Sequence, residues 1–105
     1  MSRDSRLAVT EHTHEYDFEN LTVADTAVGL TASKWQVVPY PQEVWIVAET
    51  APLRYRMDGT NPTTTIGQLL LPTDLLVIKG YTNISKLKFI RQTATSGAIN
   101  VSYRR

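Results

Sequence analysis

Apolar and polar residues alternate along much of the chain from Tyr16 onward. A period of two residues is typical of β-strands that bury one face and leave the other toward solvent. Residues 43–49, EVWIVAE, give the clearest run, with Val44, Ile46 and Ala48 on one face. We expect this face to lie in the core of the protein.

Two further segments carry the same pattern. In PLRYRMDG, every second residue from Leu53 to Met57 is apolar, and the residues between them are charged. In YDFENLTVA, we expect Phe18 on the buried face, which Leu21 and Val23 could share, with an irregularity at Glu19 and Asn20. Both segments are therefore predicted to be strands with one buried and one wetted face.

Turn signals divide the chain into about eight such segments, and its five glycines and five prolines are spread rather than clustered. We predict no helix, because the longest helix-tolerant run, GQLLLPTDLL, has Pro72 in its middle. The segment TASKWQVV is interpreted as a short strand. The pattern predicts an all-β fold, a single compact antiparallel β-sandwich of the Ig-like or jelly-roll-like kind.

The N-terminal residues 1–15 lack this alternation and mix charged side chains, among them Arg3 and Arg6, with few apolar ones. A segment of this composition is expected to be disordered in isolation. We therefore divide the 105 residues into an extended N-terminal arm, residues 1–15, and a β-sandwich domain, residues 16–105. The arm is expected to serve as a tether that lies on a neighbouring protein.

Composition narrows the classes of function. The chain has 14 threonines, whose β-branched side chains favour strands, and it has no cysteine for a disulfide or a thiolate nucleophile. Its net charge of +1 is too balanced to predict direct nucleic-acid binding. No apolar run approaches the ~20 residues of a membrane helix, and we see no secretion signal at the N-terminus.

The stretch APLRYRMDGTNPTTTIGQLL admits two interpretations. Asp58 could be a catalytic carboxylate, but it has no acidic neighbour, and only a distant residue such as Asp74 could supply the second carboxylate of a glycosidase-like site. Asp58, Gly59 and Pro62 are otherwise the residues of a structural turn, since Gly permits positive φ and Asp bonds the following backbone. We favour the turn, and we expect no catalytic residues and no enzymatic activity.

Three aromatic residues lie around a proline break, namely Trp35, Tyr40 and Trp45. They could fill the core, form a protein interface or offer a platform for a glycan. We include them in a predicted assembly interface, to which the arm would contribute basic side chains and the C-terminal segment SYRR would contribute a second tether. That interface consists of Arg3, Arg6, Trp35, Tyr40, Trp45, Arg104 and Arg105.

Two other groupings are interpreted as solvated surface. His12 and His14 could begin a metal site, but Glu11 and Glu15 are the only nearby candidates for further ligands, so we expect no metal and no cofactor. A basic stripe could attract nucleic acid if aromatic rings lay among its charges. Its aromatic neighbour Tyr55, however, is expected on the opposite face of the strand. The stripe comprises Arg54, Arg56, Lys86, Lys88 and Arg91.

The segment RYRMDGTNPT resembles the strand-turn signature of small Ig-like modules, including those appended to bacterial chitobiases and other glycan-active enzymes. In those modules an aromatic strand runs into Asp-Gly-Ser/Thr-x-Pro-Thr, and the motif is structural.

A longer resemblance covers most of residues 20–103. The order of NLTVADTAVGLTAS, APLRYRMDGTNPTTTIGQLL and KFIRQTATSGAINVSY is similar to a group of small proteins encoded among the virion genes of tailed bacteriophages.

The second resemblance implies a virion structural protein, most simply a capsid decoration or cement protein that is made in the host cytoplasm and lies on the capsid surface. Its expected partners are the major capsid protein or other virion proteins, with no membrane involved, and a homo-oligomer is expected, with a trimer favoured. The charged arm is longer than in that group, which leaves the mode of attachment open. The alternative is a carbohydrate- or receptor-binding β-sandwich module of a fibre, spike or tail.

Overall fold

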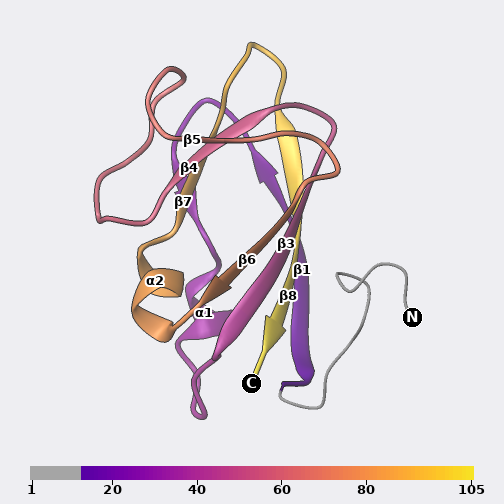
Figure 1. The fold of residues 1–105 in the computed structure, drawn as a ribbon, viewed down its shortest axis with the longest axis vertical. Coiled ribbons are helices and arrows are strands. Elements are labelled where there is room, and N and C mark those ends of the chain that lie inside the picture. Colours follow the sequence, from indigo (N-terminus) through magenta and orange to yellow (C-terminus); the bar gives the residue numbers. More distant parts are fainter. Residues whose placement is uncertain (1–12) are drawn as a thin grey trace, which may run out of the picture.

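The computed structural model describes residues 13–105, which form two four-stranded antiparallel sheets packed face to face (Figure 1). The first sheet has the spatial order β1 (Glu15–Val23), β8 (Gly97–Arg104), β3 (Glu43–Glu49) and β6 (Leu75–Lys79). The second has the order β2 (Val28–Gly29), β7 (Lys88–Arg91), β4 (Leu53–Arg56) and β5 (Gln68–Leu70). The predicted all-β sandwich of eight strands is confirmed.

Strand β3 is central to the first sheet, because it pairs with β8 on one side and with β6 on the other. Val44, Ile46 and Ala48 are fully buried, as the alternation predicted. Across the ladder, Ile46 lies opposite Val101 and Val44 lies opposite Tyr103, so the inward residues of both strands meet in register. A one-residue slip would turn all of these side chains toward solvent.

The core lies between the inner faces of the two sheets. Fully burying one such aliphatic or aromatic side chain stabilises the fold by about 1.5–3 kcal/mol. The largest fully buried side chains come from both sheets and from the segments that join them. They are Tyr103, Phe89, Ile46, Leu53, Ile84, Leu87, Ile99, Val23, Val44, Val101 and Pro41.

A polar group in this core joins β8 to β1. The buried Tyr103 hydroxyl donates a hydrogen bond to the Glu19 carboxylate. Glu19 also accepts bonds from the backbone N–H of Thr31, at 3.2 Å, and from the Thr31 hydroxyl, at 2.5 Å. Burial, and then the Glu19 carboxylate, raise the pKa of Tyr103 far above its usual range, so the phenol stays protonated and remains a donor.

Two helices correct the prediction that the chain has none. Helix α1 (Ala32–Trp35) replaces the strand expected in TASKWQVV, and α2 (Tyr81–Lys86) precedes β7. Each spans one to two turns, which is too short for a hydrophobic period to be read from sequence. Tertiary contacts hold them in place, since Ile84 of α2 is buried and Trp35 of α1 packs against the core.

The first strand also departs from expectation. Phe18, predicted to be buried, is 49% exposed, and the register shift falls between Glu15 and Asp17 rather than at Glu19 and Asn20. Downstream of this bulge the register is unbroken from Asp17 to Val23, so Phe18 alternates with the inward-facing residues and lies on the outer face. The sandwich also includes Thr13, His14 and Glu15, which the sequence assigned to the arm.

We expect Tyr103→Phe to lower the free energy of unfolding by about 1.5–3 kcal/mol, the usual cost of losing a hydrogen bond to a charged group. Urea unfolding followed by circular dichroism measures this difference. Tyr40→Phe is the matched control, because the Tyr40 side chain is exposed and its replacement should change stability by less than about 0.5 kcal/mol. Equal stabilities of the two variants would show that the Glu19 contact contributes nothing.

Candidate functional site at the terminal end of the sandwich

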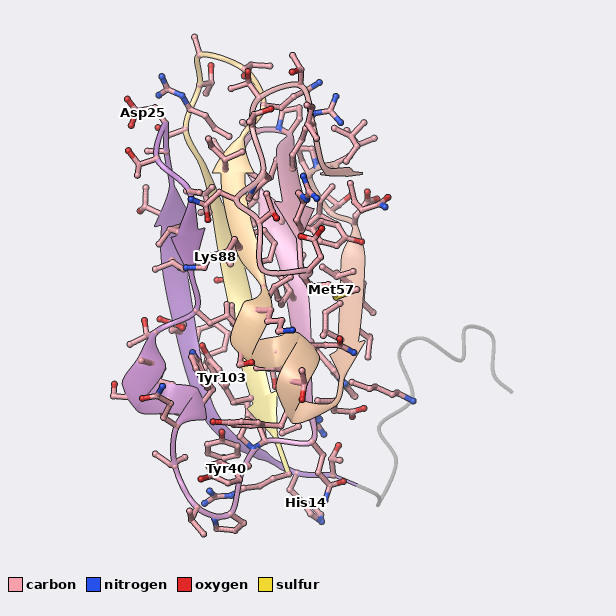
Figure 2. The ribbon with its side chains drawn as sticks, turned by 90° about the vertical axis from the view of Figure 1, so that its left-hand side faces the viewer. His14, Asp25, Tyr40, Met57, Lys88 and Tyr103 are labelled. Atoms are coloured by element: carbon pink, nitrogen blue, oxygen red, sulfur yellow. The ribbon has the colours of Figure 1, made fainter. Side chains whose placement is uncertain are left out.

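The chain enters and leaves the sandwich at the same end, where the backbones of His14 and Arg105 exchange two hydrogen bonds of 3.1 Å. Figure 2 shows His14 and Tyr40 together at this end and Asp25 at the opposite one. We call the surface formed by His14, Tyr16, Trp35, Val38, Tyr40, Tyr81 and Arg105 the terminal end. It includes Trp35, Tyr40 and Arg105, which the sequence assigned to an assembly interface.

A closed polar cluster fixes the chain as it reaches this end. The buried Arg104 donates from Nε to the Thr13 hydroxyl and from Nη2 to the Thr13 carbonyl, each at 3.1 Å. Its guanidinium lies 3.9 Å from the centroid of the Trp45 ring, a cation–π contact. Glu43 Oε2 accepts bonds from the Thr13 hydroxyl at 2.8 Å and from Trp45 Nε1 at 3.0 Å. Thr13 is thereby anchored to β3 and β8.

Three aromatic rings form a group beside the cluster. Tyr40 lies 4.4 Å from Tyr81 between ring centroids, and Trp35 meets the same tyrosine edge-on at 5.8 Å. The Trp35 indole N–H donates to the Leu30 carbonyl at 3.2 Å, so its polar atom is satisfied inside the protein. Tyr40 is 51% exposed and Val38 is 79% exposed, so the loop that carries them presents apolar surface to solvent.

Arg105 and Tyr16 hold that loop against the sandwich. The guanidinium of Arg105 lies 3.9 Å from the centroid of the Tyr16 ring and donates to the Pro39 carbonyl at 2.8 Å. The Tyr16 hydroxyl donates to the Lys34 carbonyl at 2.8 Å. These contacts attach the loop, and helix α1 before it, to the sandwich, which reduces the conformational freedom that the loop would lose on binding.

The structure thus separates the predicted interface residues. Trp35, Tyr40 and Arg105 meet at the terminal end, whereas Trp45 and Arg104 form the polar cluster with Thr13. The expected C-terminal tether is wrong for residues 102–104, because these belong to β8. Arg3 and Arg6 lie outside the described residues. Tyr81, which joins Trp35 to Tyr40, was missed because no sequence pattern places residue 81 beside residue 40.

Asp58 lies in a turn. Its Oδ1 accepts the backbone N–H of Thr60 at 3.1 Å, the next residue, Gly59, has φ of +91°, and Pro62 is buried. Arg56 Nη2 donates to Asp58 Oδ2 at 2.5 Å. This hydrogen bond, followed by that from Thr60, lowers the pKa of Asp58 below its usual range, which favours a permanent anion rather than a general acid. These contacts are those of the turn that the sequence favoured.

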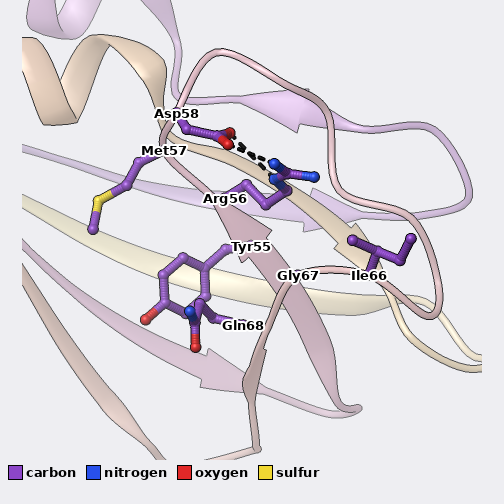
Figure 3. Close-up of a pocket in the computed structure, with 7 residues that line it drawn as sticks. All are labelled: Tyr55, Arg56, Met57, Asp58, Ile66, Gly67 and Gln68. Atoms are coloured by element: carbon purple, nitrogen blue, oxygen red, sulfur yellow. Dashed lines mark hydrogen bonds and ion pairs between the residues drawn. The ribbon is translucent and has the colours of Figure 1, made fainter.

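Beside this turn lies an open pocket of about 480 Å³ (Figure 3). Tyr55 and Gln68 lie side by side in it, while Arg56 and Asp58 are paired with each other. Asp58 is the only carboxylate among its lining residues, which are Tyr55, Arg56, Met57, Asp58, Ile66, Gly67 and Gln68. The other aspartate that we considered, Asp74, accepts the Leu71 N–H at 2.9 Å in its own turn. The pocket lining therefore lacks the two carboxylates of a glycosidase.

The remaining groupings make internal contacts. Arg54 donates to the carbonyls of Thr64 and Gly67 at 3.0 and 2.9 Å, and Arg56 is paired with Asp58, so two members of the basic stripe already have partners. Among residues 13–105, no group of three or more His, Asp or Glu side chains is placed to hold a metal ion, and His12 lies outside this range. Neither described helix has the length and apolar character needed to cross a bilayer.

Comparisons with models of protein families, with curated proteins and with solved structures gave no match to this chain.

We expect Asp58→Asn to make the free energy of unfolding depend less on pH in the acidic range. The lowered pKa of Asp58 means that its carboxylate stabilises the fold above the unfolded-state pKa of about 3.9, and that this contribution is lost as pH falls through the lower folded-state pKa. Urea unfolding at several pH values between about 2 and 6 measures the loss. The variant should lose less stability on acidification than the wild-type protein.

The partner residue supplies the control. Arg56→Gln should reduce the pH dependence of the free energy of unfolding to a similar extent. The double variant should add little, since both substitutions remove the same Arg56–Asp58 interaction. Identical acid limbs in the wild-type protein and both single variants would contradict a stabilising role for the pair.

Proposed function

We propose that the protein is a virion structural protein of a tailed phage, a decoration or cement protein that binds the capsid surface. The observation that carries the proposal is the terminal end, where Val38 and Tyr40 are exposed on a supported loop. Residues 1–12 join the sandwich at the same end, next to the anchored Thr13. The loop that carries Val38 and Tyr40 and the segment of residues 1–12 can therefore bind one partner protein at two points.

The proposed mechanism is adhesion rather than catalysis. Tyr40 offers a large apolar ring with a polar hydroxyl, the kind of side chain that dominates protein interfaces. Its stacking on Tyr81 reduces the freedom that binding must remove. On a capsid lattice, two linked contacts from each copy add through effective concentration, so individually weak contacts suffice. The partner is the major capsid protein or another protein of the virion.

A second candidate is a carbohydrate- or receptor-binding module of a fibre, spike or tail. The open pocket favours it, because Tyr55 supplies an aromatic face and Gln68 supplies amide groups that can bond sugar hydroxyls. The pocket is formed by β4, β5 and the loop between them, apart from the terminal end. Substitutions can therefore distinguish the two candidates.

Tyr40→Ala should weaken binding to capsids of the encoding virus by about 5- to 30-fold, as expected for a hot-spot aromatic residue. Co-sedimentation with procapsids and expanded heads measures the affinity. The matched control is Ile66→Ser, which removes an exposed apolar side chain from the pocket and should leave capsid binding unchanged. Loss of affinity in the control alone, together with glycan-array binding that Gln68→Ala abolishes, would favour the second candidate and contradict the first.

Deletion of residues 1–12 should weaken capsid binding and leave the melting temperature unchanged, because it keeps the contacts that residues 13–105 make with one another. Deletion of residues 1–15 should also lower the melting temperature, since it removes the Thr13 bonds to Arg104 and Glu43 and the start of β1. Calorimetry and co-sedimentation of both truncated proteins measure the two effects. Capsid binding that is unchanged by either deletion would contradict a role for the arm as a tether.

A further inference from the structure

The first sheet ends in two edge strands, β1 on one side and β6 on the other. Within residues 13–105, β6 pairs with β3 alone. The outer edge of such a strand presents backbone N–H and C=O groups that can pair with another chain, and proteins usually block these edges. The way in which each edge is blocked therefore indicates which of them can pair.

Three of the four edge strands are protected. Strand β1 carries the carboxylates of Glu15, Asp17 and Glu19 and is bent by its register shift. In the second sheet, β2 has two residues and β5 has three, which leaves little backbone to pair. Strand β6 differs, since LLVIK is five residues long, pairs without a register shift and has a single charge at its end, Lys79.

The outer face next to β6 is apolar up to this edge. Val77 lies opposite Trp45 of β3, and Leu75 lies opposite Val47. Leu75 is 38% exposed and Val77 is 41% exposed, so the two edge residues present aliphatic surface to solvent. Figure 1 shows β6 lying alongside β3 at the margin of this sheet. Aliphatic side chains at an open edge are what strand pairing between chains would cover.

The register shows which backbone groups of β6 point away from β3. Gly80 donates to the Gln42 carbonyl at 2.8 Å, and Ala48 donates to the Asp74 carbonyl at 3.3 Å, so positions 80 and 74 bond toward β3. Hydrogen-bonded pairs alternate along an antiparallel ladder. Leu76 and Ile78 therefore also bond toward β3, and the backbone groups of Leu75, Val77 and Lys79 point away from it.

We infer that β6 pairs antiparallel with β6 of a second copy of this chain, about a two-fold axis at Val77. Val77 then lies opposite Val77 of the second copy, and Leu75 lies opposite its Lys79. All three outward-facing residues find hydrogen-bonding partners, because the two-fold operation maps their outward backbone groups onto one another. The Lys79 carbonyl already accepts the Asn83 side-chain amide at 3.0 Å, and its second lone pair accepts the N–H of Leu75 of the second copy. The two first sheets become one continuous sheet of eight strands.

Charge selects this orientation. Antiparallel pairing separates the two Lys79 residues by four residue steps, about 14 Å along the strand. It also places each Lys79 opposite Leu75 of the other strand, the residue that directly follows Asp74. Parallel pairing in register would set the two lysines directly opposite each other, which is destabilising. The single charge at one end of β6 is thus compatible with a two-fold partner.

This contact is smaller than the roughly 1,600 Å² of a standard protein interface, since it consists of one strand pair and the flanking apolar side chains. We therefore expect a dimer whose fraction rises with concentration in the micromolar range. The inference does not depend on the proposed capsid role, because it concerns contact between copies of the chain in solution.

Sedimentation velocity of the full chain between about 1 and 500 μM tests the proposal. The wild-type protein should approach the mass of a dimer. Val77→Pro should remain a monomer with an unchanged fold, because the N–H that proline lacks points away from β3 and is used only between copies. Val77→Lys should also be monomeric, whereas Thr22→Lys, which adds the same charge to the other edge strand, should dimerise like the wild-type protein.

A crosslink locates the contact. The chain has no cysteine, so Val77→Cys provides a single thiol that should form a disulfide-linked dimer on mild oxidation. Residues directly opposite each other in a hydrogen-bonded antiparallel pair lie about 5.5 Å apart between Cα atoms, within the range of a disulfide. Thr22→Cys should stay uncrosslinked at the same protein concentration.

Three results would overturn the proposal. One is a wild-type mass that stays monomeric throughout the concentration range or reaches that of a trimer. Another is a dimer that persists in both Val77→Pro and Val77→Lys. The third is a full chain that is monomeric but dimerises once residues 1–12 are deleted, which would identify that segment as the occupant of the edge.

Discussion

The register of β3 is the constraint on which the rest of the structure depends. Because successive side chains of a strand point to opposite faces, one choice of register assigns every residue of β3 at once. Inward, Val44 and Ile46 join the core. Outward, Glu43 and Trp45 receive Thr13 and Arg104, and Val47 continues the apolar surface toward β6. The core, the anchor of the N-terminal segment and the character of the open edge thus share one origin.

Sequence reasoning succeeded where the controlling interactions are local. The alternation of β3 and the turn at Asp58 depend on neighbouring residues, and both are present. Phe18 was misassigned because a bulge upstream of it changes which face it occupies. Arg104 was predicted at an interface, but it is buried and hydrogen-bonded to Thr13, 91 positions earlier in the chain. No pattern within a short window contains such a contact.

The same limit explains the candidate site. Tyr40, Trp35 and Arg105 could be chosen as residue types suited to protein contacts, but their meeting at one end follows from the antiparallel topology. Helix α2 brings Tyr81 to Tyr40, and the end of β8 brings Arg105 to the loop that contains Pro39. The two surfaces that we associate with adhesion, the terminal end and the β6 edge, both belong to one sandwich and differ in chemistry. One offers aromatic side chains and the other offers backbone hydrogen bonds.

The position of the C-terminal residue has a practical consequence. Since Arg105 pairs with His14 and bonds the Pro39 carbonyl, a purification tag or fluorescent protein fused after Arg105 would crowd the Tyr40 loop. The connection between β7 and β8, residues 92–96, lies at the far end of the sandwich (Figure 1). A label inserted there would project away from the terminal end, and it would leave the aromatic loop free for imaging of the protein on its target.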